Sequence, residues 1–229
     1  MDEVEGAPVG RRVVLGMLGL GALGVALGSR AQDKVGDVLA PISGIIPAAG
    51  GFRYYTVTSS VPEETAQTYR LEVSGRVAKK RTLTMADLAA LPQTSLTRDF
   101  QCVTGWRVKD VAWSGVALPD LLDACGADPK AAAITFTSFD GVYTESLTME
   151  QARRRDMLVA TSMLGGPVTH DHGGPVRLFT APMYGYKSLK WLGGIEVVDE
   201  VEPGYWELRG YDVDAWVGRS NGRTDAPTS

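Results

Sequence analysis

The chain has 229 residues, of which 44% are hydrophobic and 22% charged, a composition typical of a globular protein with room for one sizeable domain. Its formal net charge of −4 and pI near 5.3 argue against nucleic-acid binding, which needs a basic surface. The two cysteines, Cys102 and Cys125, are too few for a disulfide framework.

The N-terminal segment predicts export. Arg11 and Arg12 precede an uncharged run over residues 13–27, which is shorter than the ~20 residues that span a bilayer. Paired arginines before a short apolar run are typical of a twin-arginine signal. We therefore expect residues 1–31 to be such a signal, with an uncleaved membrane anchor over 13–27 as the alternative. Both place the protein in the periplasm or at the extracytoplasmic face of the membrane.

The following residues predict a linker and then a folded domain. Residues 32–51 are rich in Gly, Pro and Ala and show no periodic pattern. Strands are expected over 54–58 and 69–75 from their β-branched and aromatic residues. Thr84, with Asp87 three residues later, predicts the start of a short helix that runs to Leu91, before Pro92.

The rest of the domain predicts short strands interrupted by short helices. Cys125 lies at the end of an amphipathic helix that Gly126 terminates, so we expect it in the core. The absence of a regular βαβ rhythm favours an α+β fold. The expected elements are a strand-turn over 111–116, helices over 119–125 and 149–154 (the second capped by Thr148), and strands over 133–139, 158–161, 176–180 and 194–198.

Cys102 lies in a polar and aromatic stretch, RDFQCVTGWR (98–107), which we expect to be a loop. A lone cysteine is most often a small core residue. The alternative is a sulfur that binds a ligand. The stretch alone does not decide between these two interpretations.

A second group of residues favours a phosphate-bearing ligand. The segments are HGGPVR (172–177) and YGYKSLKW (184–191). Each residue has an ordinary explanation, since Gly-Gly-Pro makes a turn and Lys in a loop is usually solvated. Together, however, a His, an Arg, two Lys, a Ser and the free amides of a glycine-rich loop suit a phosphate.

These segments, with QCVTGW (101–106) and WSGVAL (113–118), resemble the molybdopterin-binding domain of the sulfite oxidase superfamily. Among its members the chain is most similar to bacterial periplasmic catalytic subunits of the methionine sulfoxide reductase type. The resemblance implies an α+β fold of mixed β-sheets with short helices over residues 52–202. Residues 203–229 would then be a C-terminal extension with a polar tail.

The resemblance also implies a Mo-molybdopterin cofactor whose metal is bound by the Cys102 thiolate, a soft ligand. Phe52 stands where the reductase has Asn. The residues that match cofactor contacts of the family are Tyr55, Thr56, Ser138, His172, Arg177, Ser188, Leu189 and Lys190. The candidates to line a substrate pocket are Thr104, Trp106, Tyr143 and Tyr184, whereas Trp113 is expected in the core.

The predicted activity is two-electron oxo transfer, on a small-molecule or protein side-chain sulfoxide or another S- or N-oxide. Sulfite dehydrogenase is the alternative, disfavoured because Arg107 is the single arginine just after Cys102. A cofactor-free binding module is the alternative of another class, and it would be expected to lack Cys102 or Arg177. The chain has no Cys-x-x-Cys-His haem motif, so we expect a monomeric catalytic subunit with a separate electron-transfer partner, a membrane haem protein or a soluble cytochrome.

Overall fold

The structure is a computed structural model that describes residues 52–53, 56–57 and 64–223. The predicted signal or anchor, the linker and most of the strand expected over 54–58 lie outside these residues. Within the described part of the chain, no helix is both long and apolar enough to cross a membrane.

The first of two five-stranded sheets contains both the first strand, β1, and the last strand, β10, of the described residues. Its order is β2-β1-β10-β5-β6, and only the β1–β10 pair is parallel. Alternate residues of β1, Leu71 and Val73, are buried, as expected for a strand with one face on a core. The strands are β1 (Leu71–Gly75), β2 (Arg81–Leu83), β5 (Ala133–Ser138), β6 (Thr144–Thr148) and β10 (Leu192–Val198).

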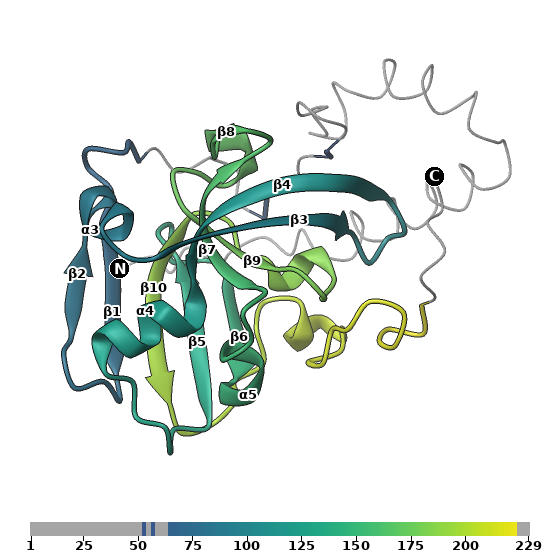
Figure 1. Ribbon diagram of the computed structural model, residues 1–229. Helices are drawn as coiled ribbons and strands as arrows, with labels where there is room; N and C mark the ends of the chain where they lie inside the picture. The colour runs from purple at the N-terminus through teal and green to yellow at the C-terminus, as the bar shows by residue number, and fades with distance from the viewer. Residues whose placement is uncertain (1–51, 54–55, 58–63, 224–229) are drawn as a thin grey trace, which may run out of the picture. The chain divides into compact units, whose positions relative to one another are not determined.

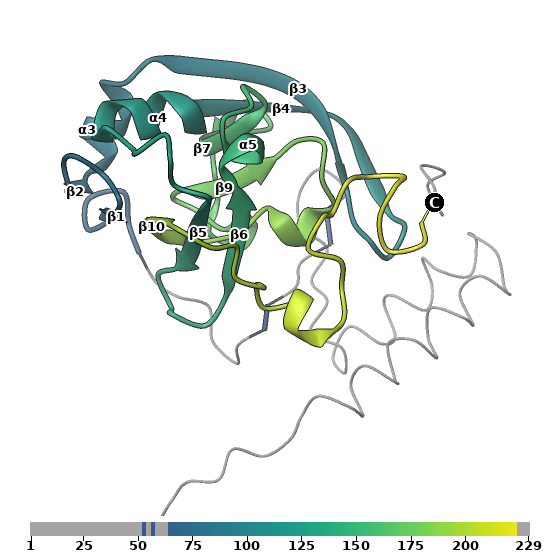
Figure 2. The same ribbon diagram turned by 90° about the horizontal axis from the view of Figure 1, so that it is seen from below.

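The second sheet carries the Cys102 stretch. Its order is β3-β4-β7-β8, and β9 also pairs with β7. Strands β3 and β4 form a long hairpin that stands out in both views (Figures 1 and 2). The strands are β3 (Gln93–Gln101), β4 (Arg107–Ala117), β7 (Met157–Met163), β8 (Gly166–Pro167) and β9 (Arg177–Thr180).

The prediction of a loop over residues 98–107 was wrong at both ends of this range. Residues 98–101 end β3, and Arg107 begins β4, so only residues 102–106 form the turn. Strand β3 reads QTSLTRDFQ, and its exposed side chains are polar, so it lacks the apolar alternation that indicates a strand. Strand β6 was missed for a related reason, because it buries the polar residues Glu145 and Ser146.

The helices follow their sequence signals closely. Thr84 and Asp87 form a capping box, and Gly126 ends a helix in the left-handed conformation at φ +66°. Thr148 and Gln151 form a second capping box, although the helix it begins ends earlier than expected. The helices are α3 (Met85–Ala89), α4 (Leu118–Cys125) and α5 (Met149–Ala152), with the 3-10 turns η2 (His170–His172), η3 (Gly185–Lys187) and η4 (Glu207–Arg209).

Two groups of buried side chains make the core. The larger includes Cys125, which confirms its predicted core position. The smaller is an aromatic cluster, defined here as Phe52, Phe100, Trp106, Trp113 and Phe179. Trp113 is 2% exposed, as predicted, and stacks on Phe179 at a ring distance of 4.0 Å. Burial of each large apolar side chain contributes about 1.5–3 kcal/mol.

Residues 203–223, termed here the C-terminal segment, pack onto the domain. Ala215 is fully buried in the larger core, and its carbonyl accepts a hydrogen bond from Tyr184 N at 2.9 Å. Trp216 forms a β-bridge with Met183. In Figures 1 and 2 this yellow segment passes close to the end of the β3–β4 hairpin. The part predicted as an extension therefore contributes to the structure around the Cys102 turn.

Candidate functional site

The β3–β4 hairpin holds Cys102 at its tip. Cys102 N donates to Trp106 O at 2.9 Å, and Gly105 N donates to Cys102 O at 3.0 Å. Gly105 has φ +107°, a conformation that favours glycine. These backbone bonds close the turn.

The Cys102 side chain is partly exposed and packs against the aromatic cluster. Its sulfur lies 3.2 Å from Thr104 Oγ1. Burial raises the pKa of the thiol, while hydrogen bonds from Thr104 and Trp106 and the positive charge of Arg53 act in the opposite direction. The thiol therefore stays protonated by itself, and a bound metal cation would displace the proton.

The aromatic cluster lies directly behind this turn. Trp106 stacks on Phe100 at a ring distance of 5.6 Å, and Phe52 packs edge-on to Trp106 at 6.2 Å. Phe52 also meets the His172 ring at 5.0 Å. The cluster thus connects the cysteine turn with the second predicted segment, which begins at residue 172.

Arg177 lies on the other side of the same cluster. Its guanidinium stands over the rings of Phe100 and Trp113 at 5.6 and 5.5 Å. It donates to His172 O at 2.6 Å and to Ser188 O at 2.8 Å. Burial lowers the pKa of Arg177 to about 9. Its partners are neutral carbonyls, so its charge is held in the interior without an acidic neighbour to offset the desolvation.

Lys190 adds a second positive charge at this place. Burial and the charge of Arg177 lower the pKa of Lys190 to about 7, against smaller opposite effects of Asp171 and Asp140. Its ammonium lies 4.3 Å from the Trp191 ring centre. The positive charges of Arg177 and Lys190 repel each other, and a bound anion would offset this repulsion. The pair is therefore suited to bind an anion.

Glycines let the chain approach Lys190 closely. Gly173 has φ +93°, and a Cβ on it would lie 2.5 Å from Lys190 Cβ. A Cβ on Gly174 would lie 2.0 Å from the carbonyl oxygen of Val168. Any larger residue at either position would displace its neighbours. The HGGPVR segment therefore forms a tight cradle whose shape depends on both glycines.

The remaining predicted cofactor residues lie in different places. Ser188 is buried, and Thr180 N donates to its Oγ at 3.0 Å. Leu189 is part of the larger core. Ser138 is buried and bonded to the Asp140 carboxylate. Thr56 is exposed, and Tyr55 lies outside the described residues.

The four predicted substrate-pocket residues do not gather in one pocket. Thr104 is exposed and Trp106 buried, both in the Cys102 turn. Tyr143 donates from its hydroxyl to Tyr186 O at 2.7 Å. Tyr184 is 1% exposed, and its hydroxyl accepts a hydrogen bond from Gly218 N at 3.2 Å. Both tyrosine hydroxyls are thus engaged in bonds to the backbone.

Sequence reasoning missed the residues that reach the Cys102 turn from elsewhere. Tyr211 lines a pocket together with Val103 of the turn, and burial, followed by the charge of Cys102, raises its pKa. Arg53 is also close enough to act on the thiol. No local sequence signal identifies either residue, because each is remote from Cys102 along the chain.

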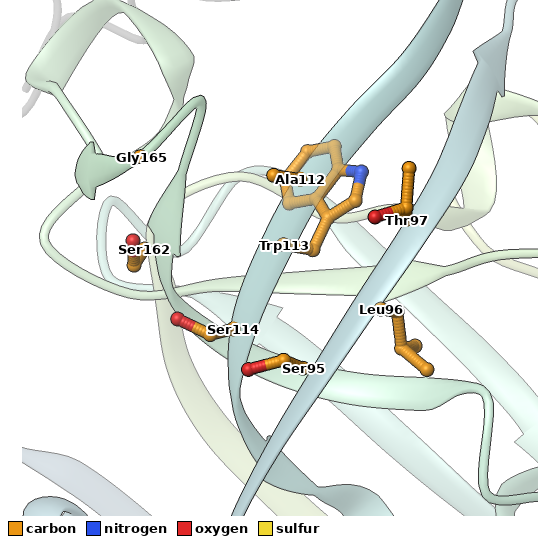
Figure 3. Close-up of a pocket in the computed structure, with 8 residues that line it drawn as sticks. All are labelled: Ser95, Leu96, Thr97, Ala112, Trp113, Ser114, Ser162 and Gly165. Carbon is orange, nitrogen blue, oxygen red and sulfur yellow. The ribbon is translucent and has the colours of Figure 1, made fainter.

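A pocket of about 220 Å³ lies away from these charged groups, against the second sheet. Figure 3 shows Ser95 and Ser114, which are paired across β3 and β4, on its wall. Among the described residues no charged or thiol side chain lines it, so it offers little for redox chemistry or for phosphate. Its lining residues are Ser95, Leu96, Thr97, Ala112, Trp113, Ser114, Ser162 and Gly165.

The described residues contain no group of three or more His, Cys, Asp or Glu side chains placed to hold a metal. Cys102 therefore stands as a single protein thiol, and further ligands would come from a cofactor. The buried Arg177 and the partly exposed Lys190 together suit the anionic phosphate of such a cofactor. The residues present thus fit a metal cofactor that carries a phosphate group.

Comparison with known proteins also indicates a cofactor of this kind. Residues 58–206 match the family described as the oxidoreductase molybdopterin binding domain. An uncharacterized oxidoreductase, YuiH of Bacillus subtilis, is 33% identical over 162 residues, covering 69% of this chain and 81% of that protein. The sulfite oxidase of Arabidopsis thaliana is 29% identical, covering 64% of this chain and 46% of its own length.

The protein-methionine-sulfoxide reductase catalytic subunit MsrP of Campylobacter jejuni is 28% identical, over 62% of this chain and 52% of its own length. The chain thus spans about half the length of these last two relatives. The crystal structure of the sulfane dehydrogenase SoxCD from Paracoccus pantotrophus is similar with a TM-score of 0.60. That match covers 71% of this chain and 46% of the other at 23% identity, and it confirms the predicted fold class.

Proposed function

Because the chain belongs to the oxidoreductase molybdopterin-binding domain family of the sulfite oxidase superfamily, we propose that Cys102 binds the molybdenum of its cofactor and that the enzyme reduces S- or N-oxides. The protein is a molybdenum-dependent oxidoreductase with a Mo-molybdopterin cofactor. The metal ligand, the substrate and the direction of the reaction are the proposal.

One observation carries the assignment of the ligand. Phe100 stacks on Trp106 of the cysteine turn and lies under the guanidinium of Arg177. The same buried ring therefore supports the thiol and the anion receptor. This shared support agrees with a cofactor that would bind through both a metal and a phosphate group.

Each residue has a distinct task in this proposal. When bound, the cofactor supplies the two-electron redox chemistry of oxygen-atom transfer. Arg177 and Lys190 hold its phosphate end, the former with a planar guanidinium fixed by two backbone carbonyls. Thr104 keeps the Cys102 sulfur in place from 3.2 Å. The aromatic cluster excludes water from the inner side of the turn.

The proposed reaction converts a sulfoxide, two electrons and two protons into a thioether and water. The electrons come from a separate one-electron carrier of the haem type, acting twice, because the chain has no haem attachment motif. MsrP is named as a catalytic subunit, which agrees with electron supply by another protein. We also propose export of the protein, in line with the Arg11-Arg12 pair.

Sulfite oxidation is the second candidate. The positive charge of Arg53 near Cys102 favours an anionic substrate. Against it, Arg107 is already engaged by Gln101 and lies 3.7 Å from Asp99. The reduction of an oxide therefore remains the first candidate.

Metal analysis and paired assays test the proposal. The protein is produced with cofactor assembly intact, and its molybdenum and pterin are measured. Reduction of sulfoxides and N-oxides with a dye donor is compared with sulfite oxidation by a dye acceptor. Cys102→Ser should keep pterin and lose activity, whereas Cys125→Ala, at a buried core cysteine, should keep activity if folded.

Three results would contradict it. Absence of molybdenum above background from the wild type would favour the cofactor-free binding module. Unchanged turnover in Cys102→Ser would show that the ligand is misassigned. Sulfite oxidation without reduction of any oxide would favour the dehydrogenase.

A further inference from the structure

A pocket of about 350 Å³ opens beside the Cys102 turn. This volume lies at the small end of the range for ligand sites. One wall is Val103, the residue after the proposed metal ligand, and the C-terminal segment provides the rest. The lining residues are Val103, Gly210, Tyr211, Asp212, Asn221, Gly222 and Arg223.

The wall from the C-terminal segment is held in a fixed shape. Asp212 N donates to Asn221 Oδ1 at 3.0 Å, and Asn221 N donates back to the Asp212 carboxylate. Tyr186 binds both sides of this loop, because its hydroxyl donates to Asp212 O at 2.6 Å and accepts from Asn221 Nδ2 at 3.0 Å. The pocket is thus preformed and attached to η3, next to Ser188, a predicted cofactor residue.

Two opposite charges line this pocket without pairing with each other. The Arg223 guanidinium has no hydrogen bond or ion pair with any described residue. The Asp212 carboxylate accepts only from the Asn221 backbone, and no described basic group lies within 4.0 Å of it. The Tyr211 hydroxyl likewise has no partner among these residues. The pocket therefore presents a cation, an anion and a hydroxyl to whatever enters it.

We propose that this pocket binds the amino-acid part of a free, zwitterionic amino-acid sulfoxide, with Arg223 on its carboxylate and Asp212 on its ammonium group. The inference rests on the proposed function and specifies its substrate class. The sulfoxide group points toward the Cys102 turn, where its S–O bond breaks and the oxygen leaves as water with two protons and two electrons from the carrier. The amino and carboxyl groups are unchanged.

Other substrate classes use these charges less well. A small neutral sulfoxide uses neither charge, and sulfite would be repelled by Asp212. A sulfoxide inside a peptide has lost both its free ammonium and its free carboxylate. A free amino acid matches both, because a guanidinium binds a carboxylate in a two-pronged manner and a carboxylate binds an ammonium group.

Binding to the cofactor-loaded enzyme tests the proposal independently of turnover. Calorimetry measures the Kd of three probes: L-methionine sulfoxide, its N-acetyl derivative, and the N-acetyl amide. The first has both charges, the second only the carboxylate and the third neither. In the wild type we expect affinity to fall in that order, by about tenfold per lost partner, the effect of one charged hydrogen bond.

Variants separate the two charges. Arg223→Gln should weaken the first two probes about tenfold and leave the third unchanged, and Arg223→Lys should restore part of the loss. Asp212→Asn should weaken only the first probe. Arg219→Gln is the matched control, because Arg219 is exposed in the same segment but does not line the pocket.

The proposal is overturned if the wild type binds the three probes equally or not at all, or if Arg223→Gln behaves as Arg219→Gln does. Failure of the proposed function has a different signature. In that case the probes bind with the expected order, but no sulfoxide or N-oxide is reduced by the molybdenum-loaded enzyme.

Discussion

The ammonium group of Lys187 lies 2.7 Å from Glu145 Oε2 in the interior, and each of these side chains is 1% exposed. A second carboxylate, that of Glu207, lies 2.5 Å from the same ammonium. Three ionisable groups from β6, η3 and η4 therefore form one buried cluster. This buried cluster ties the C-terminal segment to the loop that precedes Ser188.

Loss of the lysine should be costly. Lys187→Met leaves two carboxyl groups buried together without a cation, so we expect a loss of about 3–5 kcal/mol in the free energy of unfolding. Chemical denaturation measures it. The control is Lys109→Met, at an exposed position of β4, which should change stability little. Similar losses in both variants would contradict a special role for the buried cluster.

The buried cluster should also make stability depend on pH. Burial raises the pKa of Glu145 well above its ordinary value, and Glu207 adds to this, while Lys187 acts in the opposite direction. The folded state holds the proton of Glu145 more tightly than the unfolded state does. Protonation of Glu145 therefore stabilises the fold at low pH. This stabilisation is lost as pH rises through the folded pKa.

The stability of the wild type should therefore fall more steeply with rising pH than that of Glu145→Gln, which cannot ionise. Unfolding curves from about pH 5 to about pH 8 measure the difference, above the ordinary pKa of a glutamate. Glu150→Gln, at an exposed position, is the control and should follow the wild type. Parallel curves for the wild type and Glu145→Gln would contradict the prediction.

Arg177 should be needed for the retention of the cofactor. Arg177→Lys keeps the charge but cannot reach His172 O and Ser188 O together, so the anion receptor loses its orientation. We expect a purified protein with a folded spectrum and a strongly reduced pterin content. Arg98→Lys, at an exposed position of β3, should retain full pterin. Full pterin in Arg177→Lys would remove Arg177 from the cofactor site.

Gly173 in the cradle and Gly165 outside it offer a matched pair of substitutions. Gly165 has φ +81°, and a methyl group added to it would meet open space. Gly165→Ala should therefore lower the free energy of unfolding only by the strain of the left-handed conformation, about 1–2 kcal/mol. Gly173→Ala has the same strain and also a contact of 2.5 Å with Lys190 Cβ. It should lose more stability and also pterin. Equal effects on pterin would show that the position of Lys190 is irrelevant to the cofactor.

Sequence predicted the features that depend on neighbours along the chain. The capping residues Thr84 and Thr148 and the terminating Gly126 set helix ends through bonds within a few residues. Strand β3 escaped prediction because its exposed side chains are polar, and strand β6 because the partners of its buried polar residues are distant along the chain. Glu145 is buried only because Lys187, 42 positions later, stands against it.

The candidate site divides in the same way. Cys102 and the HGGPVR segment are contiguous motifs, so the resemblance to a family identified them. Tyr211 and Arg223 belong to a segment whose composition suggests a tail, and only its packing against the Cys102 turn places them at a pocket. The tight bonding of Tyr184 to the C-terminal segment was equally invisible, since Gly218 lies 34 positions away.

The position of β10 in the first sheet has a consequence for biosynthesis. This strand lies between β1 and β5, and its register joins Val73 to Ile195 across more than a hundred intervening residues. The first sheet therefore cannot be completed until β10 has emerged from the ribosome. Ser188 and Lys190 immediately precede β10 and reach their places with it. With Ser188 and Lys190 in the proposed cofactor site, we therefore expect the cofactor to be inserted only after the whole sheet has been translated.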